Sequence, residues 1–131
     1  MIKDVPLTGV FVNDQQAALD FYTEKLGLEK IQDELYGEGT RWITVSPTGS
    51  RIIIALEKAE RDYEKALVGR SEGAPVLVLS TDDIHATYER LRERGVRFLE
   101  EPVRYPWGGI GARFLDQDGS LIFLQQESGG Q

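Results

Sequence analysis

The amino-acid sequence predicts an α+β fold of two tandem βαβββ modules, in which two curled mixed sheets enclose a cavity. Each half of the chain contains an extended apolar segment, an amphipathic helical segment and three further extended segments, in that order. Three pairs of landmark residues share one separation of 68 positions: Asp14 and Asp82, Ala18 and Ala86, and Gly27 and Gly95. A repeated order of elements at one offset indicates an internal duplication.

The first half begins with a predicted strand from Val5 to Val12. Asn13 or Asp14 then caps a helix over QQAALDFYTEKLG, because short polar side chains accept hydrogen bonds from the free amides at a helix start. Gly27 ends this helix. Apolar residues at helical spacing form its predicted buried face: Ala17, Ala18, Phe21, Tyr22 and Leu26. Strands follow over 28–36, 40–45 and 51–57, separated by turns at 37–39 and 47–50.

The second half repeats these elements, starting with a strand from Val76 to Ser80. Thr81 or Asp82 begins a helix over DIHATYERLRER, which ends at Gly95. The predicted buried stripe of this helix is Ile84, Thr87, Tyr88 and Leu91. Strands follow over 96–101, 109–116 and 120–126, and the last two meet at the hairpin turn Asp116-Gln117-Asp118-Gly119.

We expect residues 1–131 to form a single domain, with the first module at about 4–57 and the second at about 75–126. The segment between them, 58–74, is charged and ends in glycine and proline, which is typical of a linker. One helical turn or more is expected within it, around Tyr63 to Val68.

The composition argues against several classes of function. The net charge is −7, from 22 acidic and 15 basic residues, so the chain would repel a nucleic-acid backbone. The sequence shows no run of eighteen apolar residues and no signal peptide, so we predict no membrane partner. Because cysteine is absent, disulfides and thiolate metal ligands are excluded, and the reducing cytoplasm is the simplest location.

Two segments carry a family resemblance, FYTEKLGL at 21–28 and FLDQDGSLIFLQQ at 114–126. Together with the opening LTGVFVNDQQAALD, they resemble the vicinal oxygen chelate superfamily, which includes glyoxalase I, bleomycin resistance proteins and extradiol dioxygenases. The resemblance covers residues 4–126, with Gln117 where the family commonly has proline. It implies a cavity for a small organic ligand and a homodimer. It does not name a reaction, because this fold carries many chemistries.

The resemblance also implies four cavity-facing metal-ligand positions, usually histidine or glutamate, on the first and last strands of each module. These positions fall at Leu7 (or Thr8 with one residue of slip), Ile53 or Ala55, Val76 (or Pro75 with slip) and Phe123. A divalent cation needs imidazole or carboxylate donors, which this set does not supply. We therefore predict no metal site of the family type and no cofactor.

Several aromatic residues are candidates for ligand contact. Trp42 faces the cavity if Ile43 and Val45 face the helix, whereas the opposite strand register would bury it in the helix-side core. Trp107 lies in the loop segment YPWGGIGARF, where it covers a pocket, packs the loop or contacts a second subunit. Glycines in that segment permit close backbone approach: Gly108, Gly109 and Gly111. The other aromatic residues considered are Phe11, Tyr36 and Tyr105.

Charged residues add two further candidates. Glu57 shares the strand face of Ile53 and Ala55 and is the one carboxylate predicted near the cavity. Arg113 either binds a carboxylate or carbonyl of the ligand or forms a cross-strand ion pair at the cavity rim. His85, the only histidine, is expected on the outer helix with no catalytic role. No nucleophile motif is visible, so no catalytic residue is named.

The leading hypothesis is a metal-free protein that binds a small organic, drug-like or amphiphilic molecule. The candidate ligand-contacting residues are Leu7, Phe11, Trp42, Ala55, Glu57, Val76, Trp107, Arg113 and Phe123. The alternative is a glyoxalase- or lyase-type enzyme that acts on a small carbonyl compound, with Glu57 or Arg113 in an acid–base or electrostatic role. A third hypothesis is a structural or regulatory protein in which the homodimer itself matters.

Overall fold

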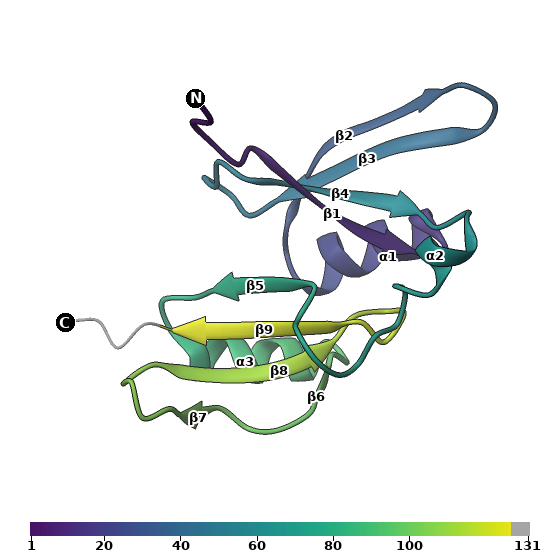
Figure 1. The fold of residues 1–131 in the computed structure, drawn as a ribbon. Coiled ribbons are helices and arrows are strands. Elements are labelled where there is room, and N and C mark those ends of the chain that lie inside the picture. The colour runs from purple at the N-terminus through teal and green to yellow at the C-terminus, as the bar shows by residue number, and fades with distance from the viewer. Residues whose placement is uncertain (127–131) are drawn as a thin grey trace. The chain divides into compact units, whose positions relative to one another are not determined.

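The computed structural model describes residues 1–126, and in it the chain forms two compact units that divide between Val68 and Gly69. Each unit contains one sheet and one principal helix, with a strand before the helix and further strands after it (Figure 1). Two separate sheets with few helices confirm the predicted α+β class and the duplicated order of elements. Within the described residues, no helix is long and apolar enough to cross a membrane.

The first unit carries a four-stranded sheet in the order β1-β4-β3-β2. Its elements are β1 (Leu7–Val12), α1 (Gln15–Asp20), η1 (Phe21–Lys25), β2 (Glu29–Tyr36), β3 (Thr40–Ser46), β4 (Ile53–Lys58) and α2 (Asp62–Lys65). Strand β1 runs parallel to β4, and the other neighbouring strands are antiparallel. Helix α2 is the helical turn expected in the segment 58–74, and it begins one residue before Tyr63.

The first helix is α-helical in α1 and continues as the π-helical segment η1. Asp14 caps α1 by accepting a hydrogen bond of 3.0 Å from the Ala17 amide, so Asp14 is the cap of the two candidates. At the end of η1, the Leu26 amide donates to the Phe21 carbonyl five residues back, which widens the last turn. Gly27 then leaves the helix with a φ of 80°, a conformation that glycine adopts without strain.

The core of the first unit lies between this helix and one face of the sheet. The strand residues buried there are Val10, Val12, Ile43, Val45, Ile54 and Leu56. From the helix they meet Ala18, Leu19 and Tyr22, and full burial of a large apolar side chain contributes about 1.5–3 kcal/mol. The prediction that Ala17 is buried is wrong. The helix instead turns Gln15 inward, where its amide bonds to strand carbonyls.

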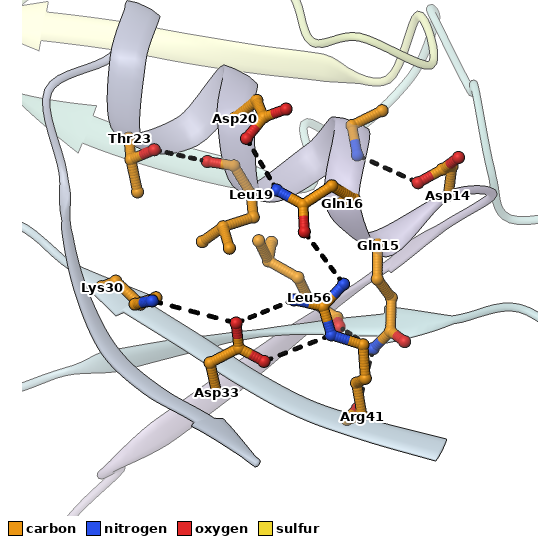
Figure 2. A network of polar contacts seen from close by, with 11 residues as sticks. Asp14, Gln15, Gln16, Leu19, Asp20, Thr23, Lys30, Asp33, Arg41 and Leu56 are labelled. Atoms are coloured by element: carbon orange, nitrogen blue, oxygen red, sulfur yellow. Dashed lines mark hydrogen bonds and ion pairs between the residues drawn. The ribbon is translucent and has the colours of Figure 1, made fainter. Parts of the chain in front are cut away.

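A polar network ties strands β2 and β3 to helix α1 (Figure 2). The Arg41 guanidinium on β3 donates to both oxygens of Asp33 on β2, at 3.2 and 2.7 Å. It also donates to Gln16 Oε1 on α1 at 3.1 Å, and Gln16 Nε2 donates to Asp20. The hydrogen bond from Arg41 lowers the pKa of the Asp33 carboxyl, and Asp33 in turn raises the pKa of Arg41. This network holds the strand pair β2–β3 against α1.

The second unit carries a five-stranded sheet in the order β5-β9-β8-β6, with β7 also paired to β8. Its elements are β5 (Leu77–Ser80), α3 (Ile84–Glu93), β6 (Arg97–Phe98), β7 (Val103–Arg104), β8 (Ile110–Leu115) and β9 (Leu121–Gln126). The predicted helix stripe is confirmed, because Ile84, Tyr88 and Leu91 are buried and Thr87 is half-buried. They pack over the face of the sheet that carries Ala112, Phe114, Ile122 and Leu124.

The predicted strand over 96–101 is wrong in its extent. Within this range only β6 is a strand, the separate short strand β7 follows it, and both pair with β8. Pro102 lies between them and has no amide hydrogen to donate to a ladder. The Glu100 carboxylate accepts a hydrogen bond of 2.6 Å from the Arg113 backbone amide of β8. A side chain therefore satisfies the backbone group of β8 where its partner strand is interrupted.

The start of the second helix differs from the prediction by one residue. Asp83, not Thr81 or Asp82, caps α3 by accepting a hydrogen bond of 3.1 Å from the Ala86 amide. The Thr81 hydroxyl instead forms a hydrogen bond with the Thr87 hydroxyl at 2.7 Å. The two caps, Asp14 and Asp83, are thus one position further apart than the predicted repeat, and Ala86 is exposed although Ala18 is buried.

The hairpin turn between β8 and β9 is confirmed. The Gly119 amide donates to the Asp116 carbonyl at 2.9 Å, and Gly119 has a φ of 86°. The Asp116 side chain is buried and accepts hydrogen bonds from the amides of Asp118 and Ser120, at 2.9 and 3.0 Å. An aspartate that bonds to amides further along the turn fixes this hairpin without the proline that the family commonly has.

The ion pair of Asp33 with Arg41 predicts a pH-dependent contribution to stability. We expect Asp33→Asn to lower the free energy of unfolding by about 0.5–1 kcal/mol at pH 7, as for a partly exposed charged pair. Because the folded-state pKa of Asp33 is lowered, the contribution is complete above the unfolded pKa of about 4. It is lost as the pH falls through the folded-state pKa.

Urea unfolding of the wild type and Asp33→Asn at pH 7, 5 and 3 measures this difference. Glu38→Gln, a substitution of an exposed turn residue, serves as the control for the loss of one negative charge. A stability difference that stays constant down to pH 3 would contradict the role given to the ion pair.

Candidate functional site

In each sheet, strand alternation directs side chains to two faces, and only one of these packs against the principal helix. We call the other face helix-distal. In the first sheet it carries Leu7, Gly9, Phe11, Trp42, Thr44, Ile53, Ala55 and Glu57. In the second sheet it carries Val78, Gly111, Arg113, Phe123 and Gln125. The candidate residues from the sequence that lie on strands thus share the helix-distal faces.

The strand register places Trp42 on the helix-distal face. Thr44 pairs with Ala55 and Val45 with Ile54, and both Ile43 and Val45 are buried on the helix side. Of the two registers left open by the sequence, the structure has the one that turns Trp42 away from the helix. Its indole Nε1 donates a hydrogen bond of 2.9 Å to Gln32 Oε1 on β2, which fixes the ring.

A pocket of about 170 Å³ lies at one end of the first sheet, and we call it the β3–β4 pocket. The paired register of β3 and β4 covers only Thr44–Ala55 and Val45–Ile54. Beyond these pairs, the Gln15 side-chain amide donates to the Arg41 carbonyl on β3 and to the Leu56 carbonyl on β4, both at 2.8 Å (Figure 2). Gln15 therefore bridges the two strands where their ladder has ended, and a pocket remains at this point.

The residues around the β3–β4 pocket combine aromatic rings with charged groups. They include Phe11, Gln15, Tyr36, Trp42, Glu57 and Glu60. Phe11 on β1 lies directly opposite Glu57 on β4 in the parallel pair. Gly9 provides the space for the Glu57 carboxylate, because a Cβ atom at Gly9 would overlap Glu57 Oε2.

A second pocket, of about 240 Å³, lies in the second unit, and we call it the aromatic cleft. Its walls are formed by Tyr105, Trp107, Gly109, Ile110, Phe123, Gln125 and Gln126. The Tyr105 and Trp107 rings are stacked, with centroids 4.5 Å apart and planes at 1°. The centroid of Phe123 lies 5.9 Å from that of Tyr105, with the ring planes at 56°. Trp107 is 72% exposed, so one face of the stack is open to a ligand.

Two glycines in the aromatic cleft leave room for its rings. A Cβ atom at Gly109 would lie 2.8 Å from Trp107 Nε1. At Gly111, a Cβ atom would overlap the ring of Phe123 and lie 2.9 Å from Tyr105 Cε2. The backbone turn that carries Trp107 is closed by a hydrogen bond of 2.8 Å from the Tyr105 amide to the Gly109 carbonyl. The glycines of YPWGGIGARF therefore allow the close packing that the sequence predicted.

Arg113 forms an ion pair rather than a free cationic site. Its guanidinium contacts the Glu100 carboxylate at 2.8 Å, in addition to the backbone hydrogen bond from Arg113 to the same carboxylate. Burial raises the pKa of Glu100, but the hydrogen bonds from Arg113 outweigh it and lower the pKa overall. Of the two alternatives for Arg113, the structure shows the ion pair, and its partner Glu100 lies in the segment between β6 and β7. Phe123 is its direct neighbour on β9.

The residues at the four ligand positions implied by the family resemblance cannot bind a metal ion through their side chains. Leu7 and Ala55 share the helix-distal face of the first sheet, while Val76 comes just before β5 and Phe123 lies in β9. Their side chains offer no nitrogen or oxygen donor to a cation. Among the described residues, no group of three or more His, Cys, Asp or Glu side chains is placed to hold a metal ion. His85 is exposed on α3, consistent with its predicted place on the outer helix.

Sequence reasoning missed two residues that shape the pockets. The sequence pattern does not mark Gln15, because a polar residue in the first turn of a helix is ordinarily exposed, whereas here it is buried. Gly9 was seen only as part of an apolar strand. A glycine within a strand often marks a close approach by another group, and that signal was available.

A profile of the Glyoxalase/Bleomycin resistance protein/Dioxygenase superfamily matches residues 5–124. The chain is 40% identical over 129 residues to the uncharacterized protein YurT of Bacillus subtilis, covering 94% of this chain and 98% of that protein. It is 25% identical over 122 residues to a probable lactoylglutathione lyase of Synechocystis sp., with 92% of this chain and 93% of that protein covered.

Two solved structures are similar over nearly the whole chain. UcmS2 has a TM-score of 0.85 at 34% identity, with 95% of this chain and 98% of that chain covered. TnmS3, an antibiotic binding protein from Streptomyces sp. CB03234, has a TM-score of 0.82 at 38% identity, with 97% and 98% covered.

Gly9 and Gly111 each lie beneath a side chain of a candidate site, and we expect their substitution by alanine to reduce stability by different amounts. We expect Gly111→Ala to lower the free energy of unfolding by about 1–3 kcal/mol, because the new methyl group overlaps the packed ring of Phe123. Gly9→Ala meets only the flexible end of Glu57, so we expect a change within about 1 kcal/mol. Thermal and urea unfolding of both variants measure these costs, and an equal loss in both would contradict the packing described.

Proposed function

We propose that this chain, which belongs to the Glyoxalase/Bleomycin resistance protein/Dioxygenase superfamily, is a binding protein for a small organic molecule and works without a metal ion. The ligand class is a partly apolar molecule with a flat ring system, drug-like or amphiphilic in character. The proposal concerns the helix-distal faces and their two pockets.

The observation that carries this proposal is the aromatic cleft. Stacked aromatic rings present a flat apolar surface, and a further aromatic ring placed on it gains about 0.5–1.5 kcal/mol beyond the burial of its area. Trp107 is held in place by Tyr105 and Gly109, yet most of its surface is exposed. Large exposed aromatic surface on an ordered loop commonly marks a contact site. Gln125 at the edge uses its Nε2 to donate to Ser80 at 3.3 Å, and its Oε1 is placed to accept a hydrogen bond from a polar ligand atom.

The similarity to TnmS3 supports the choice of ligand class. That protein is an antibiotic binding protein, and its similarity extends over almost all of this chain. Antibiotics with fused aromatic rings are therefore the first molecules to test. We also propose, from the family resemblance and the absence of cysteine, that the protein is a cytoplasmic homodimer. Sedimentation equilibrium of the purified protein tests the oligomeric state.

A glyoxalase-type enzyme is the alternative, and the similarity to a probable lactoylglutathione lyase is the observation in its favour. The apolar side chains at the four implied ligand positions argue against it, because they supply no donor for a catalytic cation. Turnover of the hemithioacetal of methylglyoxal and glutathione, dependent on added nickel or zinc and abolished by EDTA, would establish the alternative instead.

The binding proposal predicts thermal stabilisation by ligand in metal-free buffer. We screen the protein against aromatic antibiotics in buffer containing EDTA, and we expect at least one to raise the melting temperature. A ligand at a hundred times its Kd adds about 2.7 kcal/mol to the stability of the folded protein. The stabilisation should be lost or strongly reduced in Trp107→Ala, because the Trp107 side chain forms the exposed face of the stack.

Tyr63→Ala provides the matched control, because Tyr63 is also a largely exposed aromatic residue but lies outside both pockets. It should leave the ligand-induced shift unchanged. No stabilisation by any compound of the panel, or equal stabilisation of Trp107→Ala and the wild type, would count against binding in the aromatic cleft.

A further inference from the structure

We propose that the β3–β4 pocket binds an organic cation, an ammonium or amidinium group on a small apolar body, with Glu57 as its anionic partner. The inference rests on the proposed function, because it assigns a charge to part of the small organic ligand. It concerns a different pocket from the aromatic cleft, so the two can be tested separately.

In the described part of the chain, Glu57 is a carboxylate with no polar partner from another side chain, and it is therefore available to a ligand. It is half-buried and lines the pocket, and within residues 1–126 it takes part in no ion pair and no side-chain hydrogen bond. Gly9 allows the carboxylate to lie over β1 rather than extend into solvent. A carboxylate that is partly removed from water and unpaired gains from a cationic ligand that replaces the lost hydration.

The basic residues around the pocket are largely engaged elsewhere. Arg41 pairs with Asp33 at 2.7 Å, and Arg61 pairs with Glu64 at 3.3 Å. Lys58 also lines the pocket, but it is exposed, and strand alternation places its side chain on the opposite face of β4 from Glu57. If the two ion pairs are counted as neutral, the charged residues that remain around the pocket are Glu57, Glu60 and Lys58. Two negative charges against one positive charge leave the pocket with an excess of negative charge. The net charge of −7 on the whole chain acts in the same direction.

Aromatic rings provide the second part of a cation site. Phe11 lies opposite Glu57 on the neighbouring strand, and Trp42 and Tyr36 complete this side of the pocket. The face of an aromatic ring attracts a cation, most strongly for tryptophan. Because the Trp42 indole N–H is already bonded to Gln32, the ring is held in one orientation and its face remains available. A carboxylate beside aromatic rings recognises a cation better than a neutral or anionic group.

Gln15 supplies a hydrogen-bond acceptor at the same place. Its Nε2 atom donates to two strand carbonyls, which settles the orientation of the amide. Its Oε1 atom accepts no hydrogen bond from the described residues and is free for an N–H donor of the ligand. The pocket, at about 170 Å³, is smaller than a site for a whole drug-sized molecule, so it suits the charged end of one.

The two tryptophans allow each pocket to be followed separately by NMR. The side-chain indole N–H signals of ¹⁵N-labelled protein are assigned with Trp42→Phe and Trp107→Phe. We then titrate the protein with benzyltrimethylammonium and, in parallel, with benzyl alcohol and benzoate. We expect a saturable shift of the Trp42 signal with the cation, and a response at least about fivefold weaker to the neutral and anionic compounds.

Two variants test the residues that carry the inference. Glu57→Gln keeps the shape of the side chain, and we expect it to weaken binding of the cation about fivefold or more. Glu24→Gln removes the same charge from an exposed position outside the pocket and should bind as the wild type does. If Glu57→Gln does not fold, Phe11→Leu, which removes one ring, should still weaken binding about two- to fivefold.

The outcomes separate this inference from the proposed function. If benzyl alcohol shifts the Trp42 signal as strongly as the cation does, or if Glu57→Gln binds as the wild type does, the cation site is wrong. A ligand of the antibiotic panel that shifts the Trp107 signal would still support the proposed function in that case. If only the Trp42 signal responds, and only to the cation, the inference holds and binding in the aromatic cleft fails.

Discussion

The structure depends on one constraint, that a single helix covers only one face of each sheet. Strand alternation then divides the residues of both units into two sets with different roles. The helix-side set is continuous and apolar, as Ile43, Leu56 and Phe114 show, and it supplies the stability of each unit. The helix-distal set is mixed, with Trp42, Glu57 and other polar and aromatic residues among small ones. Both candidate pockets contain residues of this second set.

The β3–β4 pocket also lies where regular strand pairing stops. In the first unit, Gln15 bridges β3 and β4 beyond the end of their ladder. In the second unit, the pairing along β8 is interrupted between β6 and β7, outside the aromatic cleft, and the Glu100 carboxylate takes the place of a backbone acceptor. Backbone groups left unpaired in a partly buried position are costly, so side chains must satisfy them. The interrupted ladders thus create irregular surface while the sheets remain intact.

Local features of the fold were predictable because short stretches of sequence determine them. The first helix begins at one of the two predicted caps, Asp14, and ends at Gly27, and the turn at 116–119 follows from its own aspartates and glycine. The start of α3 was predicted one residue early, because adjacent aspartates can both cap a helix and it is Asp83 that accepts from the Ala86 amide. The strand predicted over 96–101 is shorter in the structure, where β6 ends at Phe98 and the Glu100 side chain accepts from the amide of Arg113 on β8.

By itself, the sequence determined the α+β class, the duplicated order of elements and the lack of donors at the positions where a metal was implied. These properties depend on periodicity and on residue type, which are local. Only the tertiary structure decided that Trp42 turns away from the helix, that Arg113 is held by Glu100 and that Gly9 makes room for Glu57. Each of these depends on the register between strands distant in sequence, and a shift of one residue would reverse the face of every side chain.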